Sequence, residues 1–161
     1  MYDKFGEFDS VEELNEAARG FLAEGDLKSL REFANENGLD PEDVEDYIAG
    51  DLPELATQIT AATGKLEKEI ECMKDGQIKA MCVFYANFAK TIIMENEQVA
   101  QGVMKKGARI NGIYDAIYEY AKKHKSGNIF SGATTDRQDK ELVIAYYTGE
   151  NLEKLFDKWF S

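Results

Sequence analysis

Residues Leu30 to Ile48 read LREFANENGLDPEDVEDYI, and they carry the clearest fold signal in the first third of the chain. Gly38 follows a segment with apolar residues at helical spacing, and glycine adopts at little cost the left-handed backbone that ends a helix. Asp40 and Pro41 come directly afterwards, as a side-chain cap and a first helical residue that needs no N–H. The stretch therefore predicts two helices joined by a short turn at Gly38.

The spacing around this turn resembles the helix-turn-helix pattern of transcription regulators. Ala34 provides the small side chain that a close crossing of two helices needs, and Leu39 and Val44 occupy the apolar positions of the turn and of the second helix. Such a motif crosses its helices at roughly 90–120°. As a fold signal the pattern is moderately specific, because many three-helix units share it.

The charge of the second helix argues against DNA binding. Affinity for DNA comes largely from Lys and Arg side chains that neutralise phosphates, and a recognition helix lies close to those phosphates. This helix and its flanks carry carboxylates instead, so we expect them to bind a basic protein that itself handles nucleic acid. The expected partner-binding residues are Asp40, Glu42, Asp43, Glu45, Asp46, Tyr47 and Asp51. Tyr47 would add a desolvated anchor. The alternative is a packing module with a solvated acidic face.

Helix-capping signals define the rest of an acidic three-helix head at residues 1–51. Ser10 and Glu13 match a capping box, Gly25 ends that helix, and Asp26 caps the next one. The head contains 16 acidic and 4 basic side chains, whereas residues 52–161 contain 15 of each, so the whole net charge of −12 lies in the head. Such asymmetry indicates a boundary and two surfaces with different partners, although solubility alone would also explain it.

Residues 52–161 are expected to form a helical body. Pro53 is taken as the start of a helix that runs to about Met73, with Gly64 as a possible bend. The most apolar segment, residues 77–94, predicts a helix at the centre of a bundle. Further helices are expected at about 96–105, 110–121, 135–147 and 152–160, with one loop or short hairpin near 126–134. The predicted fold class is therefore all-α.

A basic stretch offers a second candidate site. Its possible nucleic-acid-binding residues are Lys105, Lys106, Arg109, Lys122, Lys123 and Lys125. Tyr114, Tyr118 and Tyr120 are interleaved and Phe130 follows, and cations mixed with aromatic rings can bind single-stranded nucleic acid. A nucleic-acid-binding accessory factor is thus the alternative function. The structural alternative is that the lysines cap a helix end while the tyrosines pack inward.

No catalytic or cofactor motif is convincing. His124 is the only histidine, which argues against a histidine-based triad or zinc site. Residues 127–132 have the glycine spacing of a P-loop but lack the Lys-Ser/Thr that must follow. Asp136, Asp139 and Glu141 could hold a hard cation, but they better suit the start of a helix. We expect a binding protein without enzymatic activity, cofactor or metal.

The expected location is the cytoplasm. The chain has no run of about 18 apolar residues that could span a membrane, and Met1 to Glu7 contain no apolar leader. Cys72 and Cys82 are the only cysteines, and they are read as free thiols in a reducing compartment. We therefore expect no membrane partner. The oligomeric state stays open.

Two stretches are similar to small proteins of conjugative and integrative elements and phages of Firmicutes. The first runs from Phe8 to Gly64 and begins FDSVEELNEAARGFLAEGD. The second, KKGARINGIYDAIYEYAKKHKSG at residues 105–127 with DKELVIAYYTGENL at 139–152, resembles the C-terminal part of PcfK-like proteins. The resemblance brings no catalytic residues with it. It implies a bacterial cytoplasm, mobile DNA, and an accessory or anti-defence role such as that of anti-CRISPR inhibitors, with a CRISPR effector as the basic partner.

Overall fold

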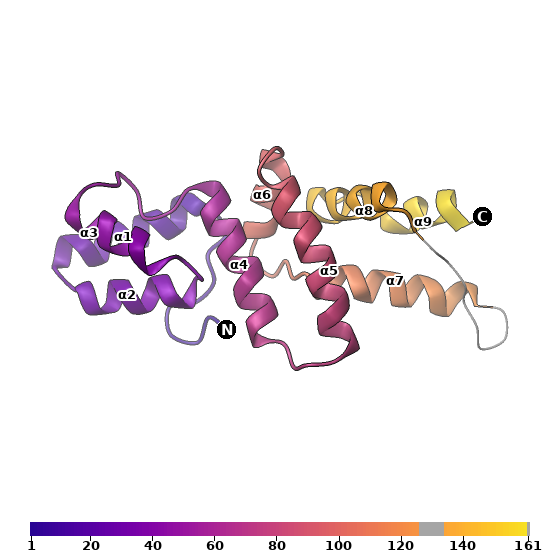
Figure 1. Ribbon diagram of the computed structural model, residues 1–161, viewed down its shortest axis with the longest axis horizontal. Helices are drawn as coiled ribbons and strands as arrows, with labels where there is room; N and C mark the ends of the chain where they lie inside the picture. Colours follow the sequence, from indigo (N-terminus) through magenta and orange to yellow (C-terminus); the bar gives the residue numbers. More distant parts are fainter. Residues whose placement is uncertain (126–133, 161) are drawn as a thin grey trace. The chain divides into compact units, whose positions relative to one another are not determined.

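The computed structural model describes residues 1–125 and 134–160, and every regular element within them is an α-helix (Figure 1). The helices are α1 (Val11–Glu24), α2 (Leu27–Glu36), α3 (Pro41–Ala49), α4 (Gln58–Cys72), α5 (Gln77–Ile92), α6 (Glu97–Met104), α7 (Asn111–His124), α8 (Asp136–Thr148) and α9 (Leu152–Phe160). The all-α prediction is confirmed for these residues. The predicted loop or hairpin lies outside them, apart from Thr134. Across the described ranges, every helix falls short of the length and hydropathy that a bilayer crossing demands.

The chain divides into two compact units. The first comprises Met1–Cys72 and Val103–Gly107, and the second comprises Met73–Gly102 and Ala108–Ser161. The boundary expected between residues 51 and 52 falls inside the first unit, because α4 packs against the turn that joins α2 and α3. Gly64 on α4 meets Gly38 there, backbone against backbone. Gly64 therefore permits this close approach, a role that its position in the sequence did not reveal.

The predicted helix caps of the first unit form as hydrogen bonds. Ser10 Oγ accepts from the backbone N–H of Glu13 at 3.2 Å, and Asp26 accepts from that of Ser29 at 3.1 Å. The Glu13 carboxylate reaches back one residue further than in a standard capping box, to the backbone N–H of Asp9 at 3.0 Å. These local bonds explain why the starts of α1 and α2 are readable from the sequence.

The core of the first unit is built around Phe33, which is fully buried. The rings of Phe5, Phe8 and Phe21 surround it, with centroids 5.3–5.6 Å from the Phe33 centroid. Edge-to-face and tilted ring pairs of this kind each stabilise a core by about 0.5–1.5 kcal/mol beyond their burial. The segment before α1 is therefore part of the folded unit, since it supplies two of the four rings.

Helix α4 begins at Gln58 and not at Pro53, so the predicted start is wrong. The reason is Asn15, a buried side chain on α1. Its amide donates to the carbonyl of Ala56 at 2.8 Å and accepts from the N–H of Ala56 at 3.0 Å. Both backbone groups of Ala56 are thus bonded to α1, which holds the preceding segment in a non-helical path. Thr57 then caps the helix by accepting from the N–H of Thr60 at 3.1 Å.

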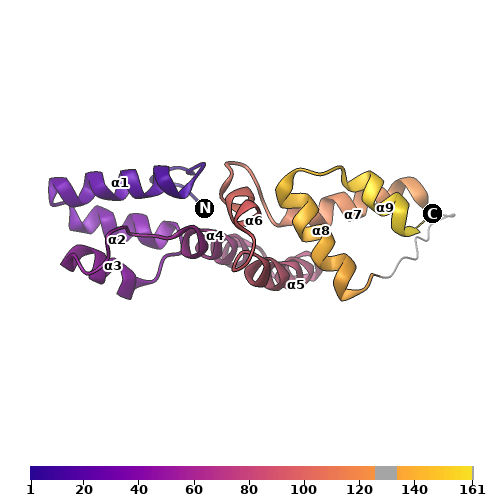
Figure 2. The ribbon, with the colours of Figure 1, turned by 90° about the horizontal axis from the view of Figure 1, so that it is seen from above.

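The second unit is a helical bundle in which α5 packs on α7 and α8, while α9 packs on the same two helices (Figure 2). Leu142 and Val143 on α8 and Ile113 on α7 are fully buried. The side of α5 that faces these helices carries Cys82 and Tyr85, both buried. The bundle therefore has a continuous apolar core of its own.

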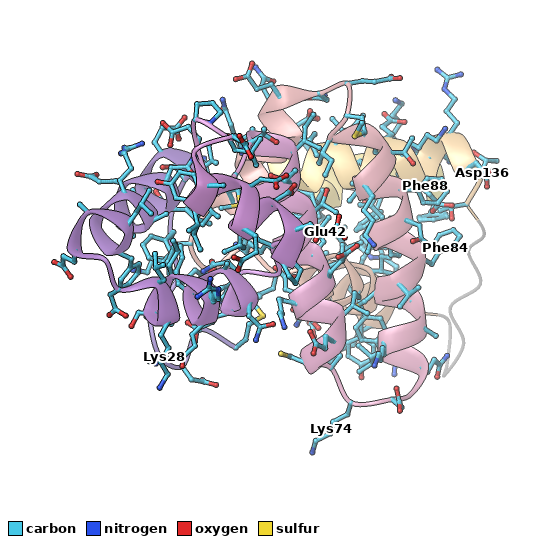
Figure 3. The ribbon with its side chains drawn as sticks, turned by 60° about the vertical axis from the view of Figure 1, so that its left-hand side comes forward. Lys28, Glu42, Lys74, Phe84, Phe88 and Asp136 are labelled. Carbon is cyan, nitrogen blue, oxygen red and sulfur yellow. The ribbon has the colours of Figure 1, made fainter. Side chains whose placement is uncertain are left out.

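Another side of α5 is only partly covered by the described residues. Phe84 on that side is 45% exposed. Phe84 and Phe88 project from the same side of the helix (Figure 3), with their ring centroids 5.0 Å apart. The expectation of a helix surrounded by the bundle holds for one side of α5 only.

Candidate partner-binding surface

Helix α3 is oriented by two buried side chains. Val44 and Tyr47 are 2% and 3% exposed and point into the first unit. The carboxylate of Asp40 accepts from the backbone N–H of Glu42 at 2.8 Å, with Pro41 at the first helical position, as predicted. Ile48 lies four residues after Val44, shares its face and is half-buried, so the acidic positions of this short helix point mainly away from the core.

The outward positions form what we call the α3 acidic face. Its members are Asp40, Glu42, Asp43, Glu45, Asp46 and Asp51, of which Asp43 is half-buried and the others are exposed. These six carboxylates lie on one short helix and its two flanks. Negative charge near the N-terminus of a helix is also favourable, so Glu42 and Asp43 stabilise α3 as well.

Glu45 is the member of this face that forms an internal ion pair. Arg31 on α2 donates to its two carboxylate oxygens at 2.6 and 3.0 Å. The shared hydrogen bond lowers the pKa of Glu45 and raises the pKa of Arg31. Among the residues that the structure describes, no Lys or Arg lies within 4.0 Å of the other five carboxylates. The α3 acidic face therefore keeps most of its negative charge available to solvent or to a partner.

Several other carboxylates of the first unit have internal roles. Glu36 accepts from the backbone N–H groups of Lys4 and Phe5, both at 3.0 Å, and so holds the N-terminal segment on α2. Arg19 on α1 binds both oxygens of Glu54 at 2.7 and 2.8 Å. The first unit still contains 20 acidic side chains and only 8 basic ones, so the excess negative charge is much larger than these pairs absorb.

Tyr47 does not belong to this surface, and its expected role as an exposed anchor is wrong. It follows Val44 by three residues and therefore faces the same side, into the core. Burial is the main cause that raises the pKa of its hydroxyl. Its apolar contacts stabilise the fold of the first unit and are not available to a partner.

This surface has an apolar feature other than Tyr47, which is a hollow between α2 and α3. Its volume is about 250 Å³, and it adjoins the Arg31–Glu45 ion pair. The buried residues Ala34, Leu39 and Val44 contribute to its lining, together with Asn35 and Pro41. We call it the α2–α3 hollow. The sequence marked Ala34 and Leu39 as crossing and turn positions, but the hollow itself depends on how far apart the two helices pack.

The basic stretch does not form one surface of either unit. Lys105 and Lys106 belong to the first unit, whereas Arg109, Lys122, Lys123 and Lys125 belong to the second. In the second unit, Lys122 pairs with Glu119 at 3.7 Å and Lys123 pairs with Glu153 at 3.1 Å. Two of the cations expected to meet phosphate therefore already have carboxylate partners on α7 and α9.

Lys105 and Lys106 are held through their backbones by a polar cluster of the first unit. Lys65, which is 3% exposed, pairs with Glu7 at 3.0 Å and donates to the carbonyl of Lys105 at 2.8 Å. The N–H of Lys106 donates to Asp9 at 2.8 Å. A buried cation is tolerated when it is paired and hydrogen-bonded in this way. This cluster could not be predicted from the sequence, because Lys65 lies 58 residues from Glu7.

The tyrosines of α7 divide between core and surface. Tyr120 is 6% exposed and donates to Asp157 at 3.0 Å, as the inward-packing alternative predicts. Tyr118 is 54% exposed, and its ring stacks on Tyr114 with centroids 6.1 Å apart. Phe130 lies outside the described residues, as do residues 127–132.

The residues considered for metal binding or catalysis form other contacts. Asp139 is 4% exposed and accepts from the hydroxyl of Thr134 at 2.8 Å. His124 stacks on Tyr120 with ring centroids 4.0 Å apart. Over the described ranges, no three or more His, Cys, Asp or Glu side chains come together in a way that could hold a metal ion. Cys72 is exposed and Cys82 is buried, and neither forms a disulfide within the part of the chain that the structure describes.

Comparison with known proteins returns no relative: no family model matches the chain, and no curated protein or solved structure shows significant similarity to it.

Proposed function

We propose that this chain is a non-enzymatic inhibitory protein of a phage or mobile element, which docks the α3 acidic face on a basic nucleic-acid-binding surface of its target. The observation that supports this most directly is the set of carboxylates on α3 and its flanks that have no cation partner among the described residues. Exposed like charges repel one another and lower stability unless something compensates for them. A basic partner would supply that compensation.

The α2–α3 hollow supports the same proposal from its geometry. Charge complementarity mainly gives steering and specificity, whereas affinity needs at least one well-packed, desolvated contact. The hollow lies beside Glu45 and has an apolar floor that includes Ala34 and Leu39. A single aliphatic or aromatic side chain of the partner would fit into about 250 Å³. The acidic face would then orient the partner, and the hollow would hold its anchor.

The class of partner follows from the negative charge of the α3 acidic face. Surfaces that hold nucleic acid are rich in Lys and Arg, and they bind carboxylates by the same electrostatic attraction. The resemblance to mobile-element proteins favours a bacterial defence protein, and we propose an RNA-guided CRISPR nuclease in the bacterial cytoplasm. Binding should weaken as salt rises, because charges more than about 10 Å apart are largely screened at 0.1 M salt.

The test compares two triple variants with the same change in net charge. The first, Glu42→Lys with Asp43→Lys and Asp46→Lys, reverses the α3 acidic face while leaving the Arg31–Glu45 pair intact. The matched control reverses Glu12, Glu16 and Glu24, which are exposed positions on α1. Binding to a guide-loaded CRISPR nuclease, and inhibition of its cleavage of target DNA, are measured at low and moderate salt.

The proposal expects the α3 variant to lose binding by at least about tenfold while the α1 variant keeps most of it. A charge contact that is local to α3 would behave in this way, whereas a general effect of net charge would weaken both variants equally. Circular dichroism checks that both variants remain helical. Equal losses, or full inhibition by the α3 variant at moderate salt, would refute the role of this face.

A further inference from the structure

The second unit contains a pocket that the proposed docking surface does not use. Its volume is about 180 Å³, and four aromatic side chains line it: Tyr85 on α5, Tyr120 on α7, and Phe156 and Phe160 on α9. The Tyr120 centroid lies 5.0 Å from that of Phe156 and 6.0 Å from that of Phe160. Aliphatic groups of Met81, Ile117 and Leu142 complete the apolar part of the wall. The pocket is therefore bounded by α5, α7, α8 and α9.

One end of the pocket is polar and ordered by a buried carboxylate. Tyr85 and Thr134 both line the pocket, and the Thr134 hydroxyl donates to Asp139 at 2.8 Å, while Asp139 also helps to raise the pKa of the neighbouring Tyr85 hydroxyl. Asp139 is 4% exposed and Tyr85 is 5% exposed. A hydroxyl that donates its proton keeps lone pairs that can accept another hydrogen bond. The lining thus places hydroxyl oxygens that can accept a hydrogen bond beside an otherwise apolar wall.

We propose that this pocket binds a small aromatic molecule, of one ring or one fused bicycle, that carries a single hydrogen-bond donor. A dry apolar cavity of roughly 150 Å³ is sufficient for benzene, whereas pockets for drug-sized ligands measure about 300–1,000 Å³. A volume of about 180 Å³ lies between these cases and fits a molecule the size of phenol or indole. Aromatic walls favour a flat ring by stacked and edge-to-face contacts. The ligand's donor would bond to the Tyr85 hydroxyl.

The first experiment fills the pocket. Indole is the probe, and its binding to the full chain is followed by saturation-transfer NMR and titration calorimetry. Met81→Trp places a large side chain in the lining, whereas Met94→Trp makes the same substitution at a site outside the lining that is 63% exposed. Saturable binding to the unmodified chain should weaken at least about tenfold in Met81→Trp and stay unchanged in Met94→Trp.

The second experiment tests the polar end without changing the shape of the pocket. Benzothiophene resembles indole in size but has no N–H donor. The unmodified chain should prefer indole, and Tyr85→Phe should reduce the ratio of the two affinities by about fivefold, the usual effect of one hydrogen bond. The absence of saturable indole binding at millimolar concentration, equal losses in both Trp variants, or an unchanged ratio in Tyr85→Phe would each overturn the proposal. Because these experiments use no protein partner, their outcome is independent of the docking proposal.

Discussion

Gly38 and Gly64 meet with their backbones in contact, where α4 crosses the turn between α2 and α3. A Cβ atom added to Gly64 would lie 2.6 Å from the backbone carbonyl oxygen of Asn37, closer than folded proteins allow. Backbone atoms on both sides leave no flexible group that could yield. This contact explains why residues 58–72 belong to the first unit together with the acidic helices.

Gly64→Ala should therefore destabilise the first unit by about 1–3 kcal/mol, the usual cost of an overpacked core. The loss should occur even though alanine is intrinsically the better helix former. Chemical denaturation followed by amide hydrogen exchange in α2 and α4 would measure it. Gly20→Ala is the matched control: Gly20 lies on α1 with no atom within 4 Å of the added Cβ. That change should stabilise by about 0.5–1 kcal/mol. A stabilised Gly64→Ala variant would contradict the observed packing.

Asn15→Ala should cost about 2–4 kcal/mol of folding free energy. The substitution removes the side chain that binds both backbone groups of Ala56, and a buried donor or acceptor without a partner costs about 1–3 kcal/mol. Asn35→Ala, at an exposed position on α2, should change stability by no more than about 0.5 kcal/mol. Urea denaturation of the two variants provides the comparison, and similar stabilities would show that the segment before α4 is held by other contacts.

The ion pair between Arg31 and Glu45 should make the stability of the first unit depend on pH. Its hydrogen bonds hold the pKa of Glu45 below the ordinary value of 4.5. The stabilising contribution is therefore fully present above the ordinary pKa and is lost as pH falls through the lowered pKa of the folded state. Carboxyl NMR titration should show the pKa of Glu45 rising toward its ordinary value in Arg31→Gln. Lys28→Gln, a charge removal on the same helix, should leave it unchanged.

The raised pKa of Tyr85 predicts that the fold loses stability at high pH. Burial is the main cause that raises its pKa from 10.0 to about 12, and the neighbouring Asp139 adds to it. Its contribution is present below the ordinary pKa of the unfolded chain and is lost as pH rises from 10.0 to about 12. Ultraviolet absorbance should show a late ionisation whose amplitude falls by one tyrosinate in Tyr85→Phe. An unchanged late amplitude would show that Tyr85 does not contribute to it.

Most of the helices and much of the acidic surface could be predicted from local sequence patterns. Capping residues, C-terminal glycines and apolar spacing act within one or two turns of chain, so Ser10, Asp26 and Asp40 could be assigned from their neighbours alone. The carboxylates of α3 were readable for the same reason, because a helix of known phase fixes which positions point outward.

Contacts between distant helices set the remaining features, including which of the predicted site residues are exposed. Tyr47 points into the core, and Glu45 pairs with Arg31. Helix α4 begins later than predicted because Asn15 binds Ala56, which lies 41 residues further along the chain. The aromatic pocket likewise joins α5, α7 and α9. Such contacts depend on how whole helices pack, and packing is set by the combined shape of many side chains distant in sequence, which no local pattern encodes.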